Sequence, residues 1–493
     1  ARKIRSIKVF AEIQPFNIDI AKIKEINPNG IVLSDRSQQV LRENEFLLNK
    51  EIFELGIPIL GIGYGMQFIA ESFKAKVIID EKSDPGVTEI EVLDKDDLFF
   101  EIANNFSAKI NPNFALKEIP NDFEIIAKNS DSSIAAIRSK EQMIYGIQFY
   151  IEDEPTGNGA KLLENFARRI CKCKEDWDEK TVIASQIKEI KDRVGNSKVI
   201  CALSGGVDST TLAVLLHKAI GEGLHCIHID TGLMRKNESS TIIELFKESF
   251  HIPVEIIDAS EMFLERLKGI TNPETKRKII GNTFIELFEE AAKKIEGAEF
   301  LAQGTLYPDI IESVSADGRS VKVKSHHNVG GLPEKMNFKL VEPFKELFKD
   351  EVRAIGRELK IPERFTGRHP FPGPGLAVRL MGGITKERLD ILREADDIFT
   401  QELRNFDLYN QIWQAFVVLL SEKTVGVSNG ERTYQNVVAI RAVTSCDGMS
   451  ADFFELPYPF LRKISNRIIN EVQGINRVVY DISTKPPSTI EWE

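Results

Sequence analysis

The stretch Ser204–Thr210, which reads SGGVDST, constrains the fold of this 493-residue chain more than any other segment. It follows a strand-like apolar run, Lys198–Leu203, and precedes a helix-like run, Asp208–Gly221. Adjacent glycines permit a turn that side chains would block, and they let backbone N–H groups approach a ligand. The positive end of the following helix faces the same point, which favours an anion. A glycine turn that only caps the helix through Asp208 or Ser209 is the alternative.

Strand-like and helix-like segments alternate over residues 1–172 and again from Lys180 to about residue 370, which predicts two α/β units with mostly parallel sheets. The charged stretch Lys174–Glu179 is the expected linker. Residues 368–375, RHPFPGPG, contain three prolines and two glycines and therefore predict a shaped loop at a domain boundary. Residues 378–493 mix helices and strands. The strands expected in the first unit are Ser6–Ile13, Gly30–Leu33, Pro58–Gly61 and Met143–Phe149.

The formal net charge of −11 argues against a general nucleic-acid or anionic-membrane surface, because binding phosphates over a large area needs a basic field. No apolar run approaches the roughly 20 residues that span a bilayer. Five cysteines in a chain of this length do not form a disulfide framework. We therefore expect a cytoplasmic protein.

Two further segments carry polar groups that suit a phosphate site. Lys276, Arg277 and Lys278 stand together before an expected helix, although a solvated charged turn has the same composition. Residues 301–313 follow an expected strand and include Gln303, Gly304 and Asp309. A carboxylate beside a triphosphate needs a cation, so Mg²⁺ held by Asp309 and Asp208 is one interpretation, and a helix-capping aspartate is the other.

Two more segments are candidates for the site. A glycine-rich stretch contains Lys324, His326 and His327, and adjacent histidines are poorly spaced for a metal, so a plain polar loop is the alternative to a phosphate-binding one. The last residues, KPPSTIEWE from Lys485 to Glu493, are stiffened by two prolines and end on an aromatic, which predicts a docked tail instead of a frayed end.

SGGVDST is not a Walker A loop and instead looks like the pyrophosphate loop of the N-type ATP pyrophosphatases. With HPFPGPGLA and KPPSTIEWE beside it, the chain resembles the glutamine-hydrolysing GMP synthases. The resemblance implies an α/β protein with three domains: a class I amidotransferase-like domain at 1–173, a doubly wound ATP pyrophosphatase domain at 174–377, and a small α+β domain for dimerisation and XMP binding at 378–493. It also implies a homodimer.

The family's reaction adenylates XMP with ATP and then aminates it to GMP, releasing AMP and pyrophosphate. Carried over residue by residue, the resemblance implies the following roles. ATP would be bound by Ser204, Gly205, Gly206, Val207, Asp208, Ser209, Thr210, Gln303 and Gly304. Asp208, Lys324 and Asp309 would be catalytic, and Asp208 and Asp309 would hold Mg²⁺. XMP would be bound by Arg277, His326, His327, Lys485, Thr489 and Glu491, and Lys324 and the histidines would lie on a lid.

The front domain resembles a class I glutamine amidotransferase but lacks its chemistry. Gly63 stands where the family has the nucleophilic cysteine, Tyr150 where it has the histidine base, and only Glu152 of the triad is kept. The segment Leu33–Ser37 replaces the family's oxyanion loop, and the chain starts at what looks like the family's first helix. Residues 1–170 contain neither cysteine nor histidine. We therefore expect an inactive glutaminase half, with ammonia taken from solution or from a separate glutaminase.

Two other functions remain open from the sequence. The chain could be a paralogous ATP-dependent ligase that amidates a different nucleotide-like substrate, since Ser428–Gly430 departs from the family's sequence and the front domain is degenerate. It could also be a non-catalytic scaffold that kept the fold, although the complete ligase motifs argue against this.

Overall fold

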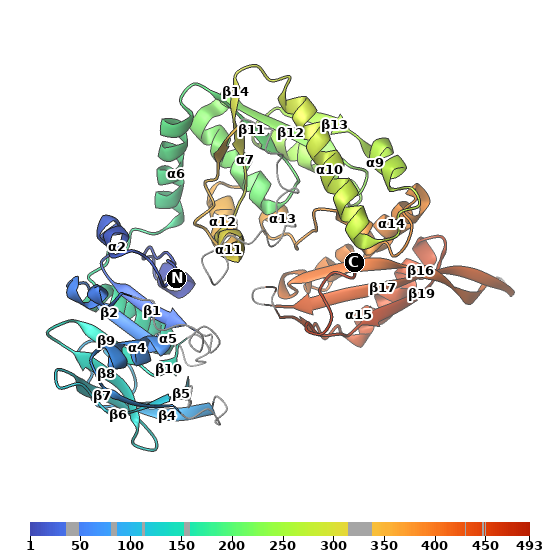
Figure 1. Cartoon of the computed structure of the whole chain (residues 1–493). Helices are drawn as coiled ribbons and strands as arrows, with labels where there is room; N and C mark the ends of the chain where they lie inside the picture. Colours follow the sequence, from blue (N-terminus) through green and yellow to red (C-terminus); the bar gives the residue numbers. More distant parts are fainter. Residues whose placement is uncertain are drawn as a thin grey trace. The chain divides into compact units, whose positions relative to one another are not determined.

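The computed structural model describes residues 1–35, 49–79, 86–110, 114–151, 158–313, 338–428, 430–445, 448 and 450–493 (Figure 1). The chain forms two compact units. The first is Ala1–Thr181, and the second begins at Val182 and, among the described residues, continues to Glu493. The expected α/β fold is confirmed, while the division into three domains at residues 173 and 377 stays a prediction. Among the described helices, none is long and apolar enough to cross a membrane.

The first unit is built on an eight-stranded mixed sheet, in which the first three strands of the spatial order run parallel and the others pair antiparallel. The order is β1 (Ile31–Asp35), β2 (Ile59–Gly63), β9 (Ile144–Ile147), β8 (Ile134–Ser139), β7 (Glu124–Asn129), β4 (Gly86–Val92), β5 (Asn105–Ile110) and β10 (Phe149–Tyr150). The strands β3 (Lys76–Ile79) and β6 (Phe114–Glu118) form a separate pair. The helical segments are α1 (Arg2–Arg5), α2 (Ile20–Ile26), η1 (Lys50–Glu54), α4 (Tyr64–Ser72), α5 (Asn158–Glu164) and η2 (Asn165–Ile170).

The predicted strand Ser6–Ile13 is wrong. Ser6 follows α1 with helical backbone angles, and Lys8 has a left-handed φ of 63°, which interrupts an extended chain. The Arg5 side chain donates to the carbonyl of Ala11 at 2.7 Å and lies against the ring of Phe10. These local contacts of Arg5 thus outweigh the β propensity of this short apolar run.

The second unit begins with a five-stranded parallel sheet, and its strand order reverses at the centre. The order is β13 (Val254–Asp258), β12 (Leu224–Asp230), β11 (Lys198–Ala202), β14 (Ala298–Ala302) and β15 (Lys339–Val341). Its helices are α6 (Glu179–Val194), α7 (Val207–Ile220), η3 (Gly221–Gly223), α8 (Glu238–Glu244), η4 (Leu245–Ser249), α9 (Ser260–Leu267), α10 (Pro273–Ala292), α11 (Tyr307–Ser313), α12 (Lys349–Glu358), α13 (Glu363–Thr366) and η5 (Gly375–Arg379). Ligands of open α/β sheets bind where the order reverses, here between the loops that follow β11 and β14.

The three cations Lys276–Lys278 do not precede a helix as predicted but lie inside α10. Asn272 caps this helix by accepting from the Thr275 amide at 3.0 Å, and Pro273 occupies the first turn. An Asn-Pro pair is a helix start signal, so the helix begins before the cations instead of after them.

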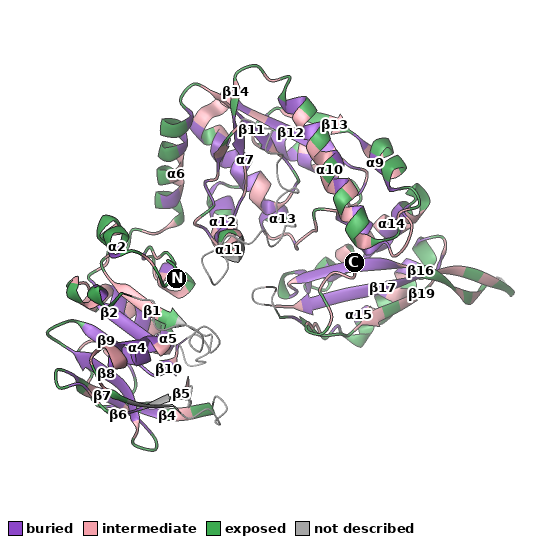
Figure 2. Cartoon of the chain, viewed as in Figure 1, coloured by how far each residue is buried: buried purple, intermediate pink, exposed green. Residues whose placement is uncertain are grey.

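The C-terminal part of the same unit is a smaller sheet with its own helices. Its strands are β16 (Gln414–Ser428), β17 (Glu431–Thr444), β18 (Asp452–Phe453) and β19 (Ile475–Asp481), and its helical segments are α14 (Lys386–Asn405), η6 (Tyr409–Gln411) and α15 (Tyr458–Glu471). One continuous apolar core joins this part to the parallel sheet, from Ile229 and Phe263 through Leu376 to Phe399 and Phe460. Figure 2 shows buried residues along β11, β12, β16 and β17.

The loop RHPFPGPG links the two parts and is fixed at both ends. Gly375 has φ 63°, and a Cβ at this position would lie 2.4 Å from the carbonyl oxygen of Leu233, so glycine is required. At the other end, the ring of His369 stacks on Tyr409 with centroids 3.9 Å apart. Its Nε2–H donates to the Tyr409 carbonyl at 2.8 Å, and its Nδ1 accepts from the Ala415 amide at 3.2 Å. The imidazole is therefore neutral.

His369 should make the second unit sensitive to mild acid. Burial lowers the pKa of His369 to about 4, against an ordinary value of 6.5. Between these two values the unfolded chain binds one more proton than the folded chain, so stability is full above about pH 6.5 and falls as the pH drops toward 4. We expect the urea midpoint of the wild type to fall over this window. His369→Gln should be less stable at pH 7 but have a shallower pH slope, and an unchanged slope would contradict this assignment.

Candidate active site

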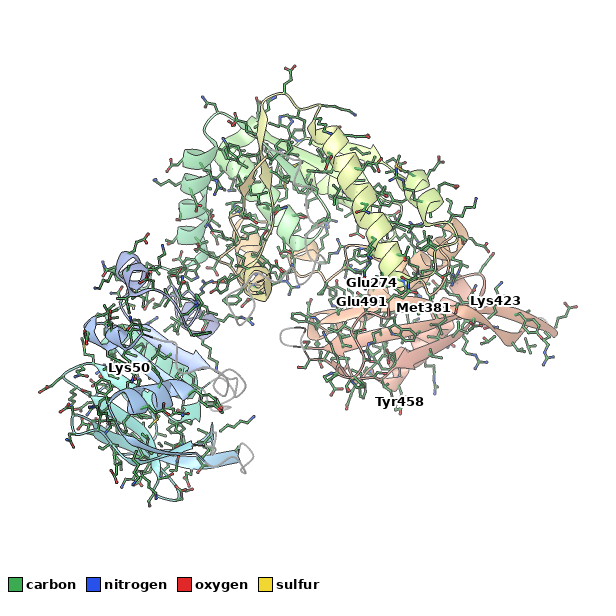
Figure 3. All side chains as sticks on the ribbon, viewed as in Figure 1. Lys50, Glu274, Met381, Lys423, Tyr458 and Glu491 are labelled. Carbon is green, nitrogen blue, oxygen red and sulfur yellow. The ribbon has the colours of Figure 1, made fainter. Side chains whose placement is uncertain are left out.

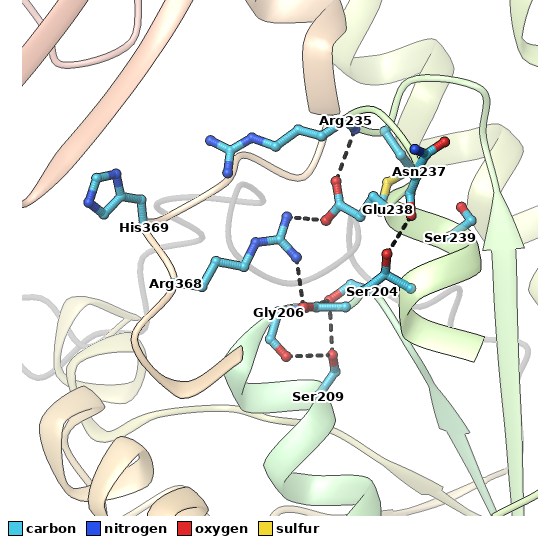
Figure 4. A network of polar contacts seen from close by, with 12 residues as sticks. Ser204, Gly206, Ser209, Arg235, Asn237, Glu238, Ser239, Arg368 and His369 are labelled. Carbon is cyan, nitrogen blue, oxygen red and sulfur yellow. Dashed lines mark hydrogen bonds and ion pairs between the residues drawn. The ribbon is translucent and has the colours of Figure 1, made fainter. Parts of the chain in front are cut away.

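The loop between β11 and α7 is shaped by Gly205 and Gly206 (Figure 4). Gly205 has φ 76°, and a Cβ there would lie 2.2 Å from Cδ1 of Ile242. Gly206 is the N-cap of α7 and provides no side-chain cap. The Ser204 hydroxyl lies 3.1 Å from the Ser209 hydroxyl and accepts from the Gly206 amide at 3.3 Å. The first amides of α7 are thus left without a carboxylate cap, as an anion-binding helix N-terminus requires.

Asp208 lies in the first turn of α7 and is the acidic residue of this loop. Its Oδ2 forms an ion pair with Lys349 at the start of α12, whereas its Oδ1 is buried and has no hydrogen-bond partner. A Cβ on Gly304 would lie 3.2 Å from Cβ of Asp208, so the loop after β14 closes against this residue. The predicted neighbourhood of Asp208 and Gly304 therefore exists. The role of Lys349 escaped the sequence reasoning.

Asp309 and Gln303 lie in the same loop region. Asp309 is the third residue of α11, and its Oδ2 accepts from the Leu306 amide at 2.9 Å, just ahead of that helix. The carboxylate thus bonds a backbone group at the helix start, although Asp309 is not itself the N-cap of the capping alternative. The Gln303 amide donates to the carbonyl of Val341 and thereby extends the pairing of β14 with β15. In the described part of the chain no group of three or more histidine, cysteine, aspartate or glutamate side chains is arranged to hold a metal.

The C-terminal tail is docked. Glu491 accepts two hydrogen bonds from the fully buried Arg379, at 3.1 and 2.8 Å, and a third from Gln414 at 2.6 Å. Ile490 and Trp492 pack with Met381 against the sheet of β16 and β17, and Figure 3 labels Met381 and Glu491. The predicted docked tail is confirmed.

The remaining tail residues of the predicted acceptor site are also held by the protein. Lys485 donates through Nζ to the Gly448 carbonyl at 2.7 Å, and the Thr489 hydroxyl donates to the Glu491 carbonyl. From α10, Arg277 donates to the carbonyl of Glu493 and pairs with Glu274 at 2.5 Å. Arg277 and the tail are thus brought together, as the sequence hypothesis requires.

Two buried cations complete this region. The sequence grouped Lys276 with Arg277 and Lys278 but did not predict its burial, and Arg441 was not predicted. Lys276 is fully buried and donates to the carboxylate of Glu493 and to the Leu380 carbonyl. Arg441, near the end of β17, donates to the carbonyls of Ser483 and Thr489. A cation inside an apolar run, as in VVAIRAV, was the available signal, because a buried charge needs a partner. The candidates Lys324, His326, His327 and Glu152 lie outside the described residues.

In the first unit, Gly63 occupies a sharp turn between β2 and α4. Its φ is 59° and its ψ is −110°, which is the strained strand-to-helix elbow of a nucleophile. A Cβ at Gly63 would lie 3.6 Å from the ring of Tyr150. The positions that the resemblance pairs are therefore neighbours in space, but they present a hydrogen atom and a phenol. Cys171 is the cysteine nearest to Gly63 in the sequence. Burial raises the pKa of Cys171, so its side chain stays a thiol and is not a ready nucleophile.

Removing the buried partner of Glu491 should release the tail. In Arg379→Met the carboxylate of Glu491 loses two charge-assisted bonds, so hydrogen-exchange protection of residues 489–493 should fall about tenfold or more while that of β17 is kept. Hydrogen-exchange mass spectrometry measures this. Lys386→Met is the matched control, since it breaks only the exposed pair with Asp390 and should leave the tail unchanged. If the tail of Arg379→Met were as protected as that of the wild type, Arg379 would not be what holds Glu491 and the tail in place.

Comparisons with known proteins agree with this geometry. Three family models match: glutamine amidotransferase class-I at residues 1–170, the PP-loop domain at 179–276, and the GMP synthase C terminal domain at 401–492. The chain is 51% identical over 492 residues to "GMP synthase [glutamine-hydrolyzing]" of Brachyspira hyodysenteriae, and 52% identical over 493 residues to the protein of that name in Aquifex aeolicus. Each match covers 100% of this chain and 96% of the relative. About half of its residues are identical to those of these relatives over its full length, so this chain belongs to the GMP synthase family.

Proposed function

We propose that this chain adenylates XMP with ATP and aminates the product to GMP with free ammonia, releasing AMP and pyrophosphate. The observation that carries the proposal is the uncapped Gly-Gly helix start at the strand-order reversal, in the same unit as the docked tail. The relatives bear the name GMP synthase, which supports this reaction. We further propose that the protein acts in the cytoplasm as a homodimer through its C-terminal part.

The loop residues Ser204–Thr210 would bind the phosphates of ATP through backbone amides and the α7 N-terminus. Gln303 and Gly304 would border this pocket. Mg²⁺ fits, because the Oδ1 of Asp208 is a buried carboxylate oxygen without a hydrogen-bond partner and Mg²⁺ prefers such ligands. Asp208, with Asp309 as the second candidate, would hold the ion, which when bound neutralises phosphate charge. Lys349 keeps the Oδ2 of Asp208 oriented.

XMP would bind beside the tail, with Arg277, Lys485, Thr489 and Glu491 as contacts and His326 and His327 as further candidates. The reaction balances without another cofactor. An oxygen of XMP attacks the α-phosphorus and pyrophosphate leaves; ammonia then attacks the activated carbon and AMP leaves with that oxygen. Lys324 would assist by stabilising phosphate charge. Arg379 and Gln414 fix the carboxylate of Glu491, so this group is positioned before substrate arrives.

The front domain keeps the elbow but, in this proposal, no glutaminase activity. Thiol attack on an amide needs a thiolate and a base, and residues 1–170 contain neither cysteine nor histidine. Burial raises the pKa of both Cys171 and Cys173, with Asp176 adding to the effect at Cys173, so neither thiol is a ready substitute. Ammonia from solution or from a separate glutaminase would supply the nitrogen.

Comparing ammonium with glutamine as the nitrogen source tests the ligase activity and the inactive front domain separately. With XMP and ATP, ammonium should support steady GMP formation, whereas glutamine at the same concentration should give less than about 1% of that rate, because a triad contributes several powers of ten. GMP and pyrophosphate release are both measured. Equal rates with glutamine would overturn the inactive front domain, and no turnover with either donor would overturn the ligase.

Asp208→Asn should remove activity without unfolding the protein. The amide keeps the size of the carboxylate but loses its charge, so kcat with ammonium should fall about 100-fold or more, while the melting temperature stays within about 2 °C since the side chain lies outside the apolar core. Asp192→Asn, which weakens only an exposed pair with Lys188, is the matched control. Wild-type kcat in Asp208→Asn would exclude this residue from the site.

A further inference from the structure

The peptide between Gly205 and Gly206 has a definite orientation in the anion-binding loop. Its carbonyl oxygen, on Gly205, accepts from Nη1 of Arg368 at 2.9 Å. Its N–H, on Gly206, points to the hydroxyl of Ser204 at 3.3 Å. In a trans peptide the C=O and the following N–H point in opposite directions, so the contact to Arg368 also sets where the amide points.

This orientation matters because a flipped peptide would turn a carbonyl oxygen toward the bound anion. An amide hydrogen attracts phosphate oxygens and a carbonyl oxygen repels them. Two adjacent glycines have no side chains to hinder such a flip, since both signs of φ are open to them. The orientation must therefore be held by the groups bonded to the peptide: the Ser204 hydroxyl inside the loop accepts from the amide, and Arg368 donates to the carbonyl from outside the loop.

Arg368 is itself held by Glu238, as Figure 4 shows. One carboxylate oxygen of Glu238 pairs with Nη2 of Arg368, and the other accepts from the Arg235 amide at 2.9 Å. Only 13% of the Arg368 side chain and 6% of that of Glu238 are exposed. The charge of Arg368 is thus balanced before any anion binds, so this guanidinium orients the loop and is not a bare phosphate ligand.

The backbone at Arg368 is also fixed. Arg353 on α12 donates to its carbonyl at 3.1 Å, and the neighbouring His369 is locked on Tyr409. The ring of Phe371 lies 5.6 Å from the guanidinium carbon of Arg368. Because its backbone is fixed and its guanidinium group is oriented, Arg368 can hold the Gly205–Gly206 peptide in one orientation.

We propose that Arg368 is a positioning residue of the pyrophosphate loop, which holds the Gly205–Gly206 peptide with its amide toward the phosphates and depends on Glu238 to do so. This inference rests on the proposed function, because it requires that the loop binds the phosphates of ATP.

The test uses the full chain and the variants Arg368→Met, Arg368→Lys and Glu238→Gln. Calorimetry gives the Kd of magnesium pyrophosphate, and kinetics with ammonium give the KM of ATP and of XMP. In Arg368→Met both the pyrophosphate Kd and the ATP KM should rise about tenfold or more, as expected for the loss of a charge-assisted hydrogen bond. The KM of XMP should stay within twofold. A lysine ammonium cannot bond the Gly205 carbonyl and the Glu238 carboxylate in the planar geometry of a guanidinium, and Glu238→Gln removes the charge that orients Arg368. Both Arg368→Lys and Glu238→Gln should therefore give intermediate values of the pyrophosphate Kd and the ATP KM.

The matched control is Arg393→Met. Arg393 on α14 likewise donates to backbone carbonyls, of Gly232 and Met234, but not to the pyrophosphate loop. It should lose thermal stability and keep the affinity for pyrophosphate. An unchanged pyrophosphate Kd in Arg368→Met, or an equal rise of this Kd in Arg393→Met, would overturn the inference. If Arg368→Met does not fold, the pyrophosphate Kd of Arg368→Lys and Glu238→Gln decides instead. Failure of the wild type to aminate XMP would sink the proposed function alone, because pyrophosphate affinity is measured without turnover.

Discussion

The need to neutralise buried cations organises the C-terminal part of the chain. Lys276, Arg379 and Arg441 are fully buried, and a buried charge without a partner is strongly destabilising. Their partners come mainly from the end of the chain: Glu493 for Lys276, Glu491 for Arg379, and Asp481 for Arg441. The tail therefore docks because the interior beneath it is cationic, and its docking places the acceptor-site candidates beside α10.

A second constraint fixes the pyrophosphate loop relative to that tail. Strand order reverses between β11 and β14, which leaves room for a ligand at the Gly-Gly turn. The apolar core that includes Ile229, Leu376 and Phe460 is continuous through both parts of the second unit. Loop RHPFPGPG crosses between them: His369 is bonded to Tyr409 at one end, and Leu376, the residue after the loop, donates to the Leu233 carbonyl at the other. Reaction between ATP and a nucleotide acceptor requires such preorganisation, since misplacement by about 1 Å costs orders of magnitude in rate.

Local patterns in the sequence predicted those features whose causes are local. The Gly-Gly turn after an apolar strand and the helix expected at Asp208–Gly221 agree with the structure, in which α7 is Val207–Ile220, because their signals lie within a few residues of one another. The predicted start of α10 was wrong, although the cap Asn272 and Pro273 mark the true start, because a cluster of cations is as common in a charged turn as in the first turns of a helix. The pairs of Lys349 with Asp208 and of Arg379 with Glu491 span 141 and 112 residues, so no periodicity could have revealed them.

In the proposed function, the first unit keeps the amidotransferase fold without its glutaminase activity. Gly63 adopts the backbone angles of the elbow and lies close to Tyr150, where the resemblance implies a cysteine and a histidine. The central claim is that this chain takes its amino group from ammonia alone. Its most direct test offers ¹⁵N-ammonium and unlabelled glutamine together, with XMP and ATP, and reads the GMP by mass spectrometry. The account predicts that the new amino group is ¹⁵N throughout; substantial unlabelled GMP, in protein free of other glutaminases, would contradict it.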